Sequence, residues 1–395
     1  MKYIRRQLQS EITRAVKAFP AVVVTGPRRA GKAWMLRHLF PKADYYLLED
    51  PDVVARVRND AQGFLDAVTF PAILDEIQNA PELFAYIRSR IDRHPRRTGQ
   101  WLMTGSQEAP LMQGVSESMA GRAGIFQLLP FSSAESPKVS ILRGGYPEVL
   151  ARPSNARQWF ASYLQTYIER DVRAVTAVRD MATFRRFLAL VASRHGQILR
   201  KTDLAAPLGV SVPTITHWLG VLEITEQILI IPPFFENLGK RLVKSPRVYV
   251  ADSGLACHLL GIDTAAELAK SPFAGVLFEG FIASELIKRQ VNAGARRELY
   301  YFRDEQGLEV DFLLPRAGGG LALVECKSGK TVTPTMAAPL HRLAEAVQRK
   351  RPKGTRVDSY LVHQPPAAKT RTTALAPGIR AMPWRDFLSA LDESD

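Results

Sequence analysis

One short stretch constrains the fold of this chain most, because residues 26–32 fit the pattern G-x-x-x-x-G-K. The β-branched run 21–25 precedes it and predicts a buried strand, and residues 32–40 follow it with the spacing of a helix. In such a unit, the glycines let backbone N–H groups surround a phosphate, and the helix N-terminus adds its dipole. The pattern therefore predicts nucleotide binding, with Lys32 bridging the β- and γ-phosphate oxygens; the competing interpretation is an ordinary glycine turn with a surface lysine. The predicted nucleotide contacts are Gly26, Pro27, Arg28, Arg29, Ala30, Gly31 and Lys32.

The position after this lysine departs from the pattern. Serine or threonine is expected there, because its hydroxyl ligates Mg²⁺, and this chain has Ala33. We keep Ala33 among the predicted nucleotide contacts, since backbone and lysine contacts can sustain affinity without the hydroxyl. A methyl group cannot coordinate a metal ion, so Ala33 puts metal positioning and hydrolysis in question.

The apolar run 72–74 ends in two carboxylates, Asp75 and Glu76. We expect Asp75 to hold the hydration shell of Mg²⁺ through water, and Glu76 to orient the attacking water as a general base. A strand end followed by acidic loop residues is common, so an ordinary strand end is the alternative. The phosphate-binding loop upstream is what favours the catalytic interpretation.

Three further residues are predicted to contact the nucleotide. A third strand, residues 100–104, is followed by Gly105 and Ser106, and we expect one of Thr104 and Ser106 to sense the γ-phosphate. Arg122 is a candidate arginine contact to nucleotide, either on its own chain or from a neighbouring copy. Simple loop residues are the alternative for all three.

The order of predicted elements indicates three domains. Strands alternate with helices over residues 1–135, which predicts an α/β core with a parallel sheet. Residues 136–265 are mainly helical, and strands return within residues 266–395, separated by glycine turns.

The helical segment contains a candidate helix-turn-helix. Residues 202–208 and 212–223 are the predicted helices, with Gly209 in the turn and strands over 227–231 and 247–250 as a wing. The basic run 240–244 would join those strands. The second helix is poor in arginine and lysine, so a winged helix used for protein contacts or spacing competes with DNA binding. Its predicted outward-facing residues are Ser211, Thr214, Thr216 and His217.

Four charged residues near the C-terminal end match a PD-(D/E)XK nuclease-like arrangement: Glu279 on a helix, Asp311 on one strand, and Glu325 and Lys327 on the next. Side chains alternate along a strand, so Glu325 and Lys327 face the same side. In this chemistry Asp311 and Glu325 hold Mg²⁺, Lys327 orients or activates water, and Glu279 assists. A binding module of the same fold, or a solvated strand end with charged pairs, is the alternative.

Taken together, these motifs resemble the AAA+ ATPase superfamily, and more closely the bacterial and archaeal group whose AAA+ core precedes an uncharacterised C-terminal domain. The resemblance implies ATP and Mg²⁺ as cofactors and a fold of α/β class: a P-loop AAA+ core with a parallel sheet, a helical winged-helix region, and an α/β restriction-endonuclease-like domain. The residues that carry it are 26–32, 74–78, 104–106, 120–122, 129–132, 144–148 and 167–171.

Composition limits the partners. Lys plus Arg number 53 against 39 Asp plus Glu, so a net charge of +14 favours polyanions such as nucleotide or nucleic acid. Basic residues between 342 and 356 fit a DNA-facing C-terminal half. Two isolated cysteines suit a reducing compartment, and no apolar run approaches the ~20 residues of a membrane helix, so we expect a cytoplasmic protein without membrane contact.

Three functions fit the sequence. The leading one is an ATPase that couples nucleotide state to a C-terminal half that contacts DNA. The second is a nucleotide-gated binding protein without turnover, which Ala33 favours. The third is a Mg²⁺-dependent DNA nuclease with a regulatory ATPase core. Nucleotide is the expected partner in all three, and DNA and a second copy of the chain are further candidates.

Overall fold

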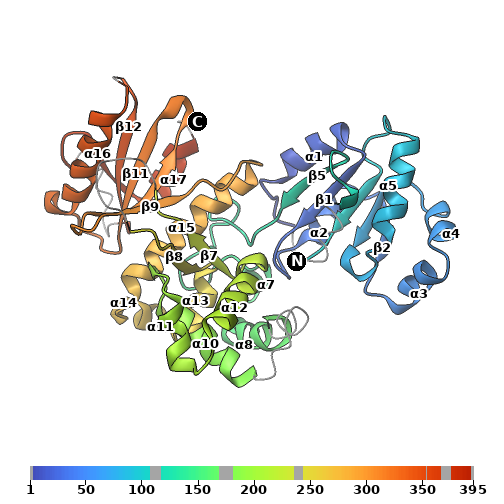
Figure 1. Ribbon diagram of the computed structural model, residues 1–395, viewed down its shortest axis with the longest axis horizontal. Helices are drawn as coiled ribbons and strands as arrows, with labels where there is room; N and C mark the ends of the chain where they lie inside the picture. Colours follow the sequence, from blue (N-terminus) through green and yellow to red (C-terminus); the bar gives the residue numbers. More distant parts are fainter. Residues whose placement is uncertain are drawn as a thin grey trace. The chain divides into compact units, whose positions relative to one another are not determined.

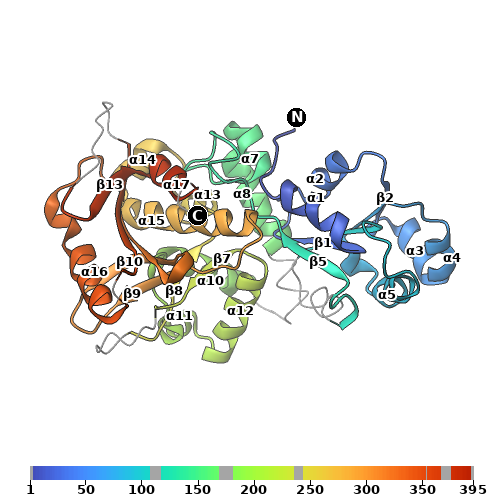
Figure 2. The same cartoon turned by 90° about the horizontal axis from the view of Figure 1, so that it is seen from above.

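The computed structural model describes residues 3–106, 117–168, 181–234, 243–352, 354–365 and 375–392 (Figures 1 and 2). The chain divides into two compact units. The first unit comprises Met1–Arg179, His217–Gln227 and Lys288–Arg296, and the second comprises Asp180–Thr216, Ile228–Ile287 and Arg297–Asp395. The expected division into three domains remains a prediction.

A parallel sheet of five strands forms the centre of the first unit, in the order β2-β3-β4-β1-β5 (Figure 1). Its strands are β1 (Ala21–Thr25), β2 (Asp44–Leu47), β3 (Ala72–Asp75), β4 (Trp101–Thr104) and β5 (Ala123–Gln127). This confirms the α/β class with a parallel sheet. The strands predicted over residues 21–25, 72–74 and 100–104 agree with β1, β3 and β4 to within one residue. Strand β5 is not predicted from the sequence, because Gly124 and Gln127 interrupt its apolar pattern.

Alternating side chains of this sheet enter two separate cores. Val22 and Val24 pack with α1 and α2 in one cluster, whereas Val23 packs with α3, α4 and α5 in the other. Both faces of the sheet are therefore buried, as is usual for parallel sheets. The helices of this unit are α1 (Gln9–Ala18), α2 (Lys32–Leu39), α3 (Pro51–Asn59), α4 (Ala61–Asp66), α5 (Leu83–Arg93), α7 (Pro147–Ala151) and α8 (Ala156–Tyr163), with 3₁₀ turns Ile77–Asn79 and Pro153–Asn155 and a π-helical turn Leu164–Ile168.

Two predicted helices have different bounds in the structure. The spacing predicts one helix over residues 1–19, but it begins only at Gln9. Arg6, just before it, is buried and donates to the backbone oxygens of Ala30 (3.0 Å) and Leu129 (2.6 Å), so tertiary contacts hold this segment in a non-helical conformation. The sequence pattern also predicts a helix over residues 159–177, and in the structure this helix begins earlier, at Ala156. Its part beyond residue 168 lies outside the described residues, as do most of 167–171 and 240–244.

In the second unit, two helices meet at 112° across a turn in which Gly209 has a φ of 65°. They are α11 (Lys201–Leu208) and α12 (Val212–Ile224), and α12 continues into the first unit. Ile215 and Leu219 are buried, whereas Ser211, Thr216 and His217 are exposed and Thr214 is half-buried, as their spacing predicts. Neighbouring elements are α10 (Met181–Ser193), α13 (Ser253–Leu259), α14 (Ala265–Lys270) and an antiparallel sheet of β6 (Gln197–Ile198), β8 (Arg247–Val250) and β7 (Ile228–Ile231).

A mixed sheet completes the second unit, in the order β13-β12-β11-β10-β9. One face packs on α16 through Leu340, Leu343 and Val347, and the other carries Tyr360, which contacts Phe387 of α17 (Figure 2). Its elements are β9 (Tyr300–Arg303), β10 (Glu309–Pro315), β11 (Leu321–Lys327), β12 (Val357–His363), β13 (Ile379–Pro383), α15 (Ala274–Asn292), α16 (Ala338–Lys350) and α17 (Trp384–Asp392), with 3₁₀ turns Ala317–Gly319 and Pro334–Ala337.

Among the helices of the described ranges, no single one has the length and apolar character to cross a membrane, although the bent pair α11 and α12 passes that test together.

Candidate functional site

The phosphate-binding loop connects the end of β1 to the start of α2, in the place that its pattern predicts. Gly26 has a φ of 135°, and a Cβ there would lie 2.2 Å from the backbone oxygen of Leu128, so only glycine fits. Gly31, with a φ of 97°, makes the second left-handed turn. Lys32 is 5% exposed, and its Nζ donates to the backbone oxygens of Gly26 (3.0 Å) and Pro27 (3.1 Å). The loop thus folds around its own lysine ammonium.

Asp75, at the end of β3, accepts hydrogen bonds on both carboxylate oxygens. Tyr45 Oη donates to Oδ2 at 2.6 Å, and the Thr104 hydroxyl donates to Oδ1. Burial and the neighbouring carboxylate raise the pKa of Tyr45, so the phenol keeps its proton. The carboxylate is 7% exposed and held from β2 and β4. Sequence reasoning missed Tyr45, since only the pairing of β2 with β3 brings it here.

Glu76 follows Asp75 in a left-handed conformation with a φ of 57°. Its backbone N–H donates to Thr104 Oγ1 at 3.2 Å, and its Oε2 accepts from Gln78 Nε2 at 2.5 Å. Gln78 Nε2 also donates to Ser106 Oγ at 3.1 Å. The structure therefore brings Asp75, Glu76, Thr104 and Ser106 together at the carboxyl edge of adjacent strands β3 and β4. Gln78, another residue that sequence reasoning missed, restrains the Glu76 carboxylate.

Arg122 lies at the other end of the sheet. It directly precedes β5, whose pairing with β1 runs from Ala21↔Ala123 to Thr25↔Gln127. At ~3.3 Å per residue, Arg122 is about 16 Å or more from the end of β1, where the loop starts. Its guanidinium instead pairs with both carboxylate oxygens of Asp92, at 2.6 and 3.0 Å. The structure thus does not bring Arg122 to the loop of its own chain, and a contact from a neighbouring copy stays a prediction.

A cavity of about 800 Å³ in the first unit adjoins the phosphate-binding loop. Arg29 and Gly31 form one border, and aromatic side chains supply much of the remaining wall. Trp159 and Tyr163 stack at 5.0 Å between ring centroids, and Trp34 is 49% exposed. These aromatic residues have no sequence signal, because 125 residues separate Trp34 from Trp159. The aromatic lining residues are Tyr3, Trp34, Phe131, Trp159 and Tyr163.

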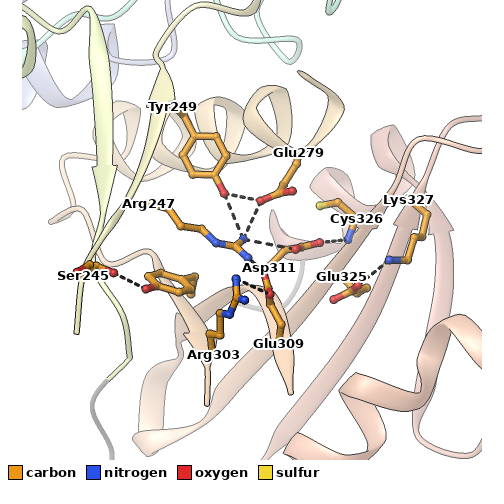
Figure 3. Close-up of polar contacts among 11 residues, drawn as sticks. Ser245, Arg247, Tyr249, Glu279, Arg303, Glu309, Asp311, Glu325, Cys326 and Lys327 are labelled. Carbon is orange, nitrogen blue, oxygen red and sulfur yellow. Dashed lines mark hydrogen bonds and ion pairs between the residues drawn. The ribbon is translucent and has the colours of Figure 1, made fainter. Parts of the chain in front are cut away.

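The predicted C-terminal cluster also assembles, around a residue that sequence reasoning missed (Figure 3). Arg247 of β8 carries a side chain that is 4% exposed, and its Nη1 lies 2.8 Å from Glu279 Oε1 and 3.5 Å from Asp311 Oδ1. Its Nη2 pairs with Glu309. The guanidinium also lies over the ring of Tyr301, 4.8 Å from the centroid. Three carboxylates from α15 and β10 therefore surround one buried cation.

Glu325 and Lys327 face the same side of β11, as predicted, and Lys327 Nζ donates to Glu325 Oε1 at 2.7 Å (Figure 3). The second oxygen of Glu325 is buried and has no hydrogen-bond partner among the residues that the structure describes. Asp311 Oδ2 accepts from the backbone N–H of Cys326 at 2.8 Å, which fixes the distance between β10 and β11 at the site.

Burial and mutual repulsion shift the protonation of these carboxyl groups. Burial, with repulsion from Asp311, raises the pKa of Glu279 to about 8, although Arg247 and Tyr249 oppose the shift. Burial and Asp311 likewise raise the pKa of Glu325 to about 7, against the opposing effect of Lys327. Burial alone would lower the pKa of Arg247, but the surrounding groups outweigh it and raise this pKa. Glu279 and Glu325 therefore titrate near neutral pH.

A close approach between α15 and the turn that follows α10 positions Glu279. A Cβ on its neighbour Gly280 would lie 2.0 Å from Nε2 of His195, so glycine lets α15 lie against that ring. Burial lowers the pKa of His195 to about 4, and its Nδ1 accepts from the backbone N–H of Val250 at 3.0 Å. The neutral imidazole therefore fixes the distance between α15 and β8, which carry Glu279 and Arg247.

The fit to a divalent metal differs between the two sites. In the part of the chain that the structure describes, no three Asp, Glu, His or Cys side chains converge in a way that could hold a metal ion. At the loop, Ala33 offers no ligand and Asp75 is the available carboxylate. In the C-terminal cluster, Arg247 lies between Glu279 and Asp311, whereas the unpartnered oxygen of Glu325 would suit a cation.

Comparison with known protein families divides the chain into three matched stretches. Residues 18–136 match an AAA domain. Residues 135–266 match a domain of unknown function, DUF8612, and residues 274–374 match another, DUF4143.

Two relatives are 32% identical over 321 residues, spanning 80% of this chain and 72% of their own length: uncharacterized protein Rv2008c of Mycobacterium tuberculosis and uncharacterized protein Mb2031c of Mycobacterium bovis. Among solved structures, the Walker-type ATPase PABY2304 of Pyrococcus abyssi is similar with a TM-score of 0.44 and 15% identity, over 65% of this chain and 96% of its own.

Proposed function

This chain belongs to the same family of AAA-domain proteins as its two mycobacterial relatives, and on that premise we propose that it binds and hydrolyses ATP. The observation that carries the proposal is the convergence of Lys32, Asp75 and Glu76 at one edge of a parallel sheet. Strand ends at this edge are where open α/β sheets bind ligands.

The loop supplies the phosphate contacts. Lys32 would exchange its two backbone carbonyl partners for phosphate oxygens, and the first turn of α2 would add N–H groups. Glu76 would orient water once Gln78 releases its carboxylate. Thr104 and Ser106, which already contact these groups, would respond to the γ-phosphate. Mg²⁺, when bound, would neutralise charge on the phosphates, and Asp75 would reach its shell through water.

The cavity beside the loop suits the base and ribose. Its volume of about 800 Å³ is in the usual range of small-molecule sites, and its aromatic lining offers stacking surfaces to a purine. Arg29 and Gly31 border both the cavity and the loop, so one ligand would extend continuously from one to the other. We place the adenosine there.

Replacing Ala33 with threonine tests how far the missing hydroxyl limits turnover. We expect Ala33→Thr to raise Mg²⁺-dependent ATP hydrolysis about tenfold, since a new ligand would position the metal. Ala33→Val is the matched control, because valine has the shape of threonine without its hydroxyl. Phosphate release is measured with and without Mg²⁺. Equal rates for both variants would show that the hydroxyl is not limiting, and wild-type protein that binds ATP without any turnover would favour the nucleotide-gated switch.

A second candidate function is metal-dependent cleavage of nucleic acid by the C-terminal cluster. The specific observation is that Asp311, Glu325 and Lys327 lie together and one buried oxygen of Glu325 lacks a partner. In that chemistry the two carboxylates hold Mg²⁺ and Lys327 orients water. We expect cleavage of labelled DNA with Mg²⁺ or Mn²⁺, and its loss in Asp311→Asn. Intact DNA under every metal condition would remove this function.

As part of this second candidate function, we propose that α11 and α12 contact DNA. The pair has the crossing angle of a helix-turn-helix, and the adjacent strands β7 and β8 would form a wing. The proposed domain layout then follows the sequence: an ATPase core over 1–135, a winged helix within 136–265, and a nuclease-like domain over 266–395. Arg122 would act on nucleotide held by a second copy of the chain.

A further inference from the structure

A second cavity, of about 440 Å³, lies in the second unit and is lined by none of the residues assigned above to a nucleotide contact. Its walls come from β6 and the start of α11, from β8, and from the β9–β10 pair. We call it the arginine pocket, after the residues that determine its charge. These are Arg194, Arg200, Arg247 and Arg303, with Asp203 and Glu309 as the acidic members.

The positive charge of this pocket is only partly compensated. Glu309 pairs with both Arg247 and Arg303. Arg194 is exposed, and within the described ranges its guanidinium bonds only the neutral amide of Gln197, at 3.2 Å. Arg200 is exposed as well, and its side chain forms no hydrogen bond or ion pair with the described part of the chain. Two guanidinium groups on one wall are therefore available to an anion.

The wall that carries them adds the start of a helix. Arg200 is the N-cap of the eight-residue helix α11, and its side chain does not cap the N–H groups of the first turn. The N–H groups of this turn and the helix dipole favour negative charge. The carboxylate of Asp203, in the same turn, repels an anion that approaches from its side of the helix. Planar guanidinium groups and N–H donors together are the usual contacts of phosphate.

The floor of the pocket connects it to the carboxylate cluster. Arg247 lines the pocket and contacts Glu279 and Asp311, as Figure 3 shows. A phosphate bound by Arg194 and Arg200 would share this pocket with Arg247, which contacts the groups proposed to cleave a phosphodiester. The volume exceeds what one small ion requires and suits a nucleotide-sized segment.

We propose that the arginine pocket binds a backbone phosphate of a nucleic-acid strand and holds that strand beside Asp311. The inference deepens the second candidate function and rests on it for the position of the strand. Binding itself needs neither ATP nor a metal ion, so it can be measured where neither catalytic site operates.

The test is fluorescence anisotropy with a labelled oligodeoxynucleotide of about 20 nucleotides, single-stranded and duplex, in EDTA at rising salt. We expect Arg194→Ala/Arg200→Ala to weaken binding roughly tenfold at low salt and to lower the salt slope by about 2. The control is Arg58→Ala/Arg96→Ala, which removes the same charge from exposed positions outside the pocket and outside the basic segment 342–356. Circular dichroism checks the fold of both variants.

Three outcomes would overturn the proposal. The first is unchanged binding by the pocket variant, and the second is an equal loss in the Arg58→Ala/Arg96→Ala control, which would show a general effect of net charge. The third is displacement of the oligonucleotide by inorganic phosphate at the same concentration of phosphate groups, which would show a small-anion site. Strand binding without any metal-dependent cleavage would leave the pocket in place and remove the nuclease function alone.

Discussion

Lys32→Met should severely weaken ATP binding and turnover while leaving the fold intact. Methionine keeps most of the apolar stem and removes only the ammonium, which the two loop carbonyls now hold at 3.0 and 3.1 Å. Loss of one charge-assisted contact to phosphate costs about 3 kcal/mol, which is roughly a 100-fold increase in Kd. Hydrolysis should fall by at least as much, because the ammonium also stabilises charge that develops on the transferred phosphate.

The measurement uses a fluorescent ATP analogue for affinity and phosphate release for turnover. Lys42→Met is the matched control, since Lys42 is exposed and lies outside the loop and its cavity. We expect the control to match the wild type in both assays. If Lys32→Met retains wild-type affinity, the loop is the ordinary glycine turn that the sequence left as an alternative.

The phosphate-binding site can be predicted from the sequence because each of its motifs is a short, contiguous stretch of the chain. The strand 21–25, the glycines and Lys32 are contiguous, and the backbone geometry of the loop follows from Gly26 and Gly31. Asp75 and Glu76 are likewise identified by an apolar run that ends in carboxylates. Parallel pairing then brings these strand ends to one edge without further information.

Other parts depend on contacts between distant segments, and no local pattern encodes them. Tyr45 reaches Asp75 only through the pairing of β2 with β3. Arg122 follows a sequence motif, yet the direction of β5 places it at the opposite end of the sheet. Arg247 is 32 residues from Glu279 and begins a strand in a different sheet from that of Asp311, so its burial among carboxylates has no sequence signal.

Arg247→Ala should destabilise the second unit strongly, and more so at alkaline pH. The substitution leaves Glu279, Glu309 and Asp311 without their shared cation, and breaking a buried ion pair on one side costs about 3–5 kcal/mol. The free energy of unfolding is measured by urea titration at pH 5, 7 and 9. Arg349→Ala, on the exposed face of α16, should stay within about 0.5 kcal/mol of the wild type.

The pH dependence follows from the raised pKa of Glu279, which is about 8 in the folded protein against an ordinary value of 4.5. A raised carboxyl pKa stabilises the fold below the unfolded value, and this stabilisation is lost as pH rises through 8. Without Arg247, the pKa of Glu279 rises further. At pH 5 and pH 7 both folded proteins hold this proton, whereas at pH 9 the wild type holds a carboxylate beside Arg247 and the variant must either take up a proton from alkaline solution or bury an unpaired charge. The loss of stability should therefore be smaller at pH 5 and pH 7 than at pH 9. Arg247→Ala/Glu279→Gln should recover part of the stability at pH 9, because the amide needs no cation. Equal destabilisation at all three pH values, without rescue by Glu279→Gln, would show that the two residues are not coupled and that Arg247 acts through packing on Tyr301 alone.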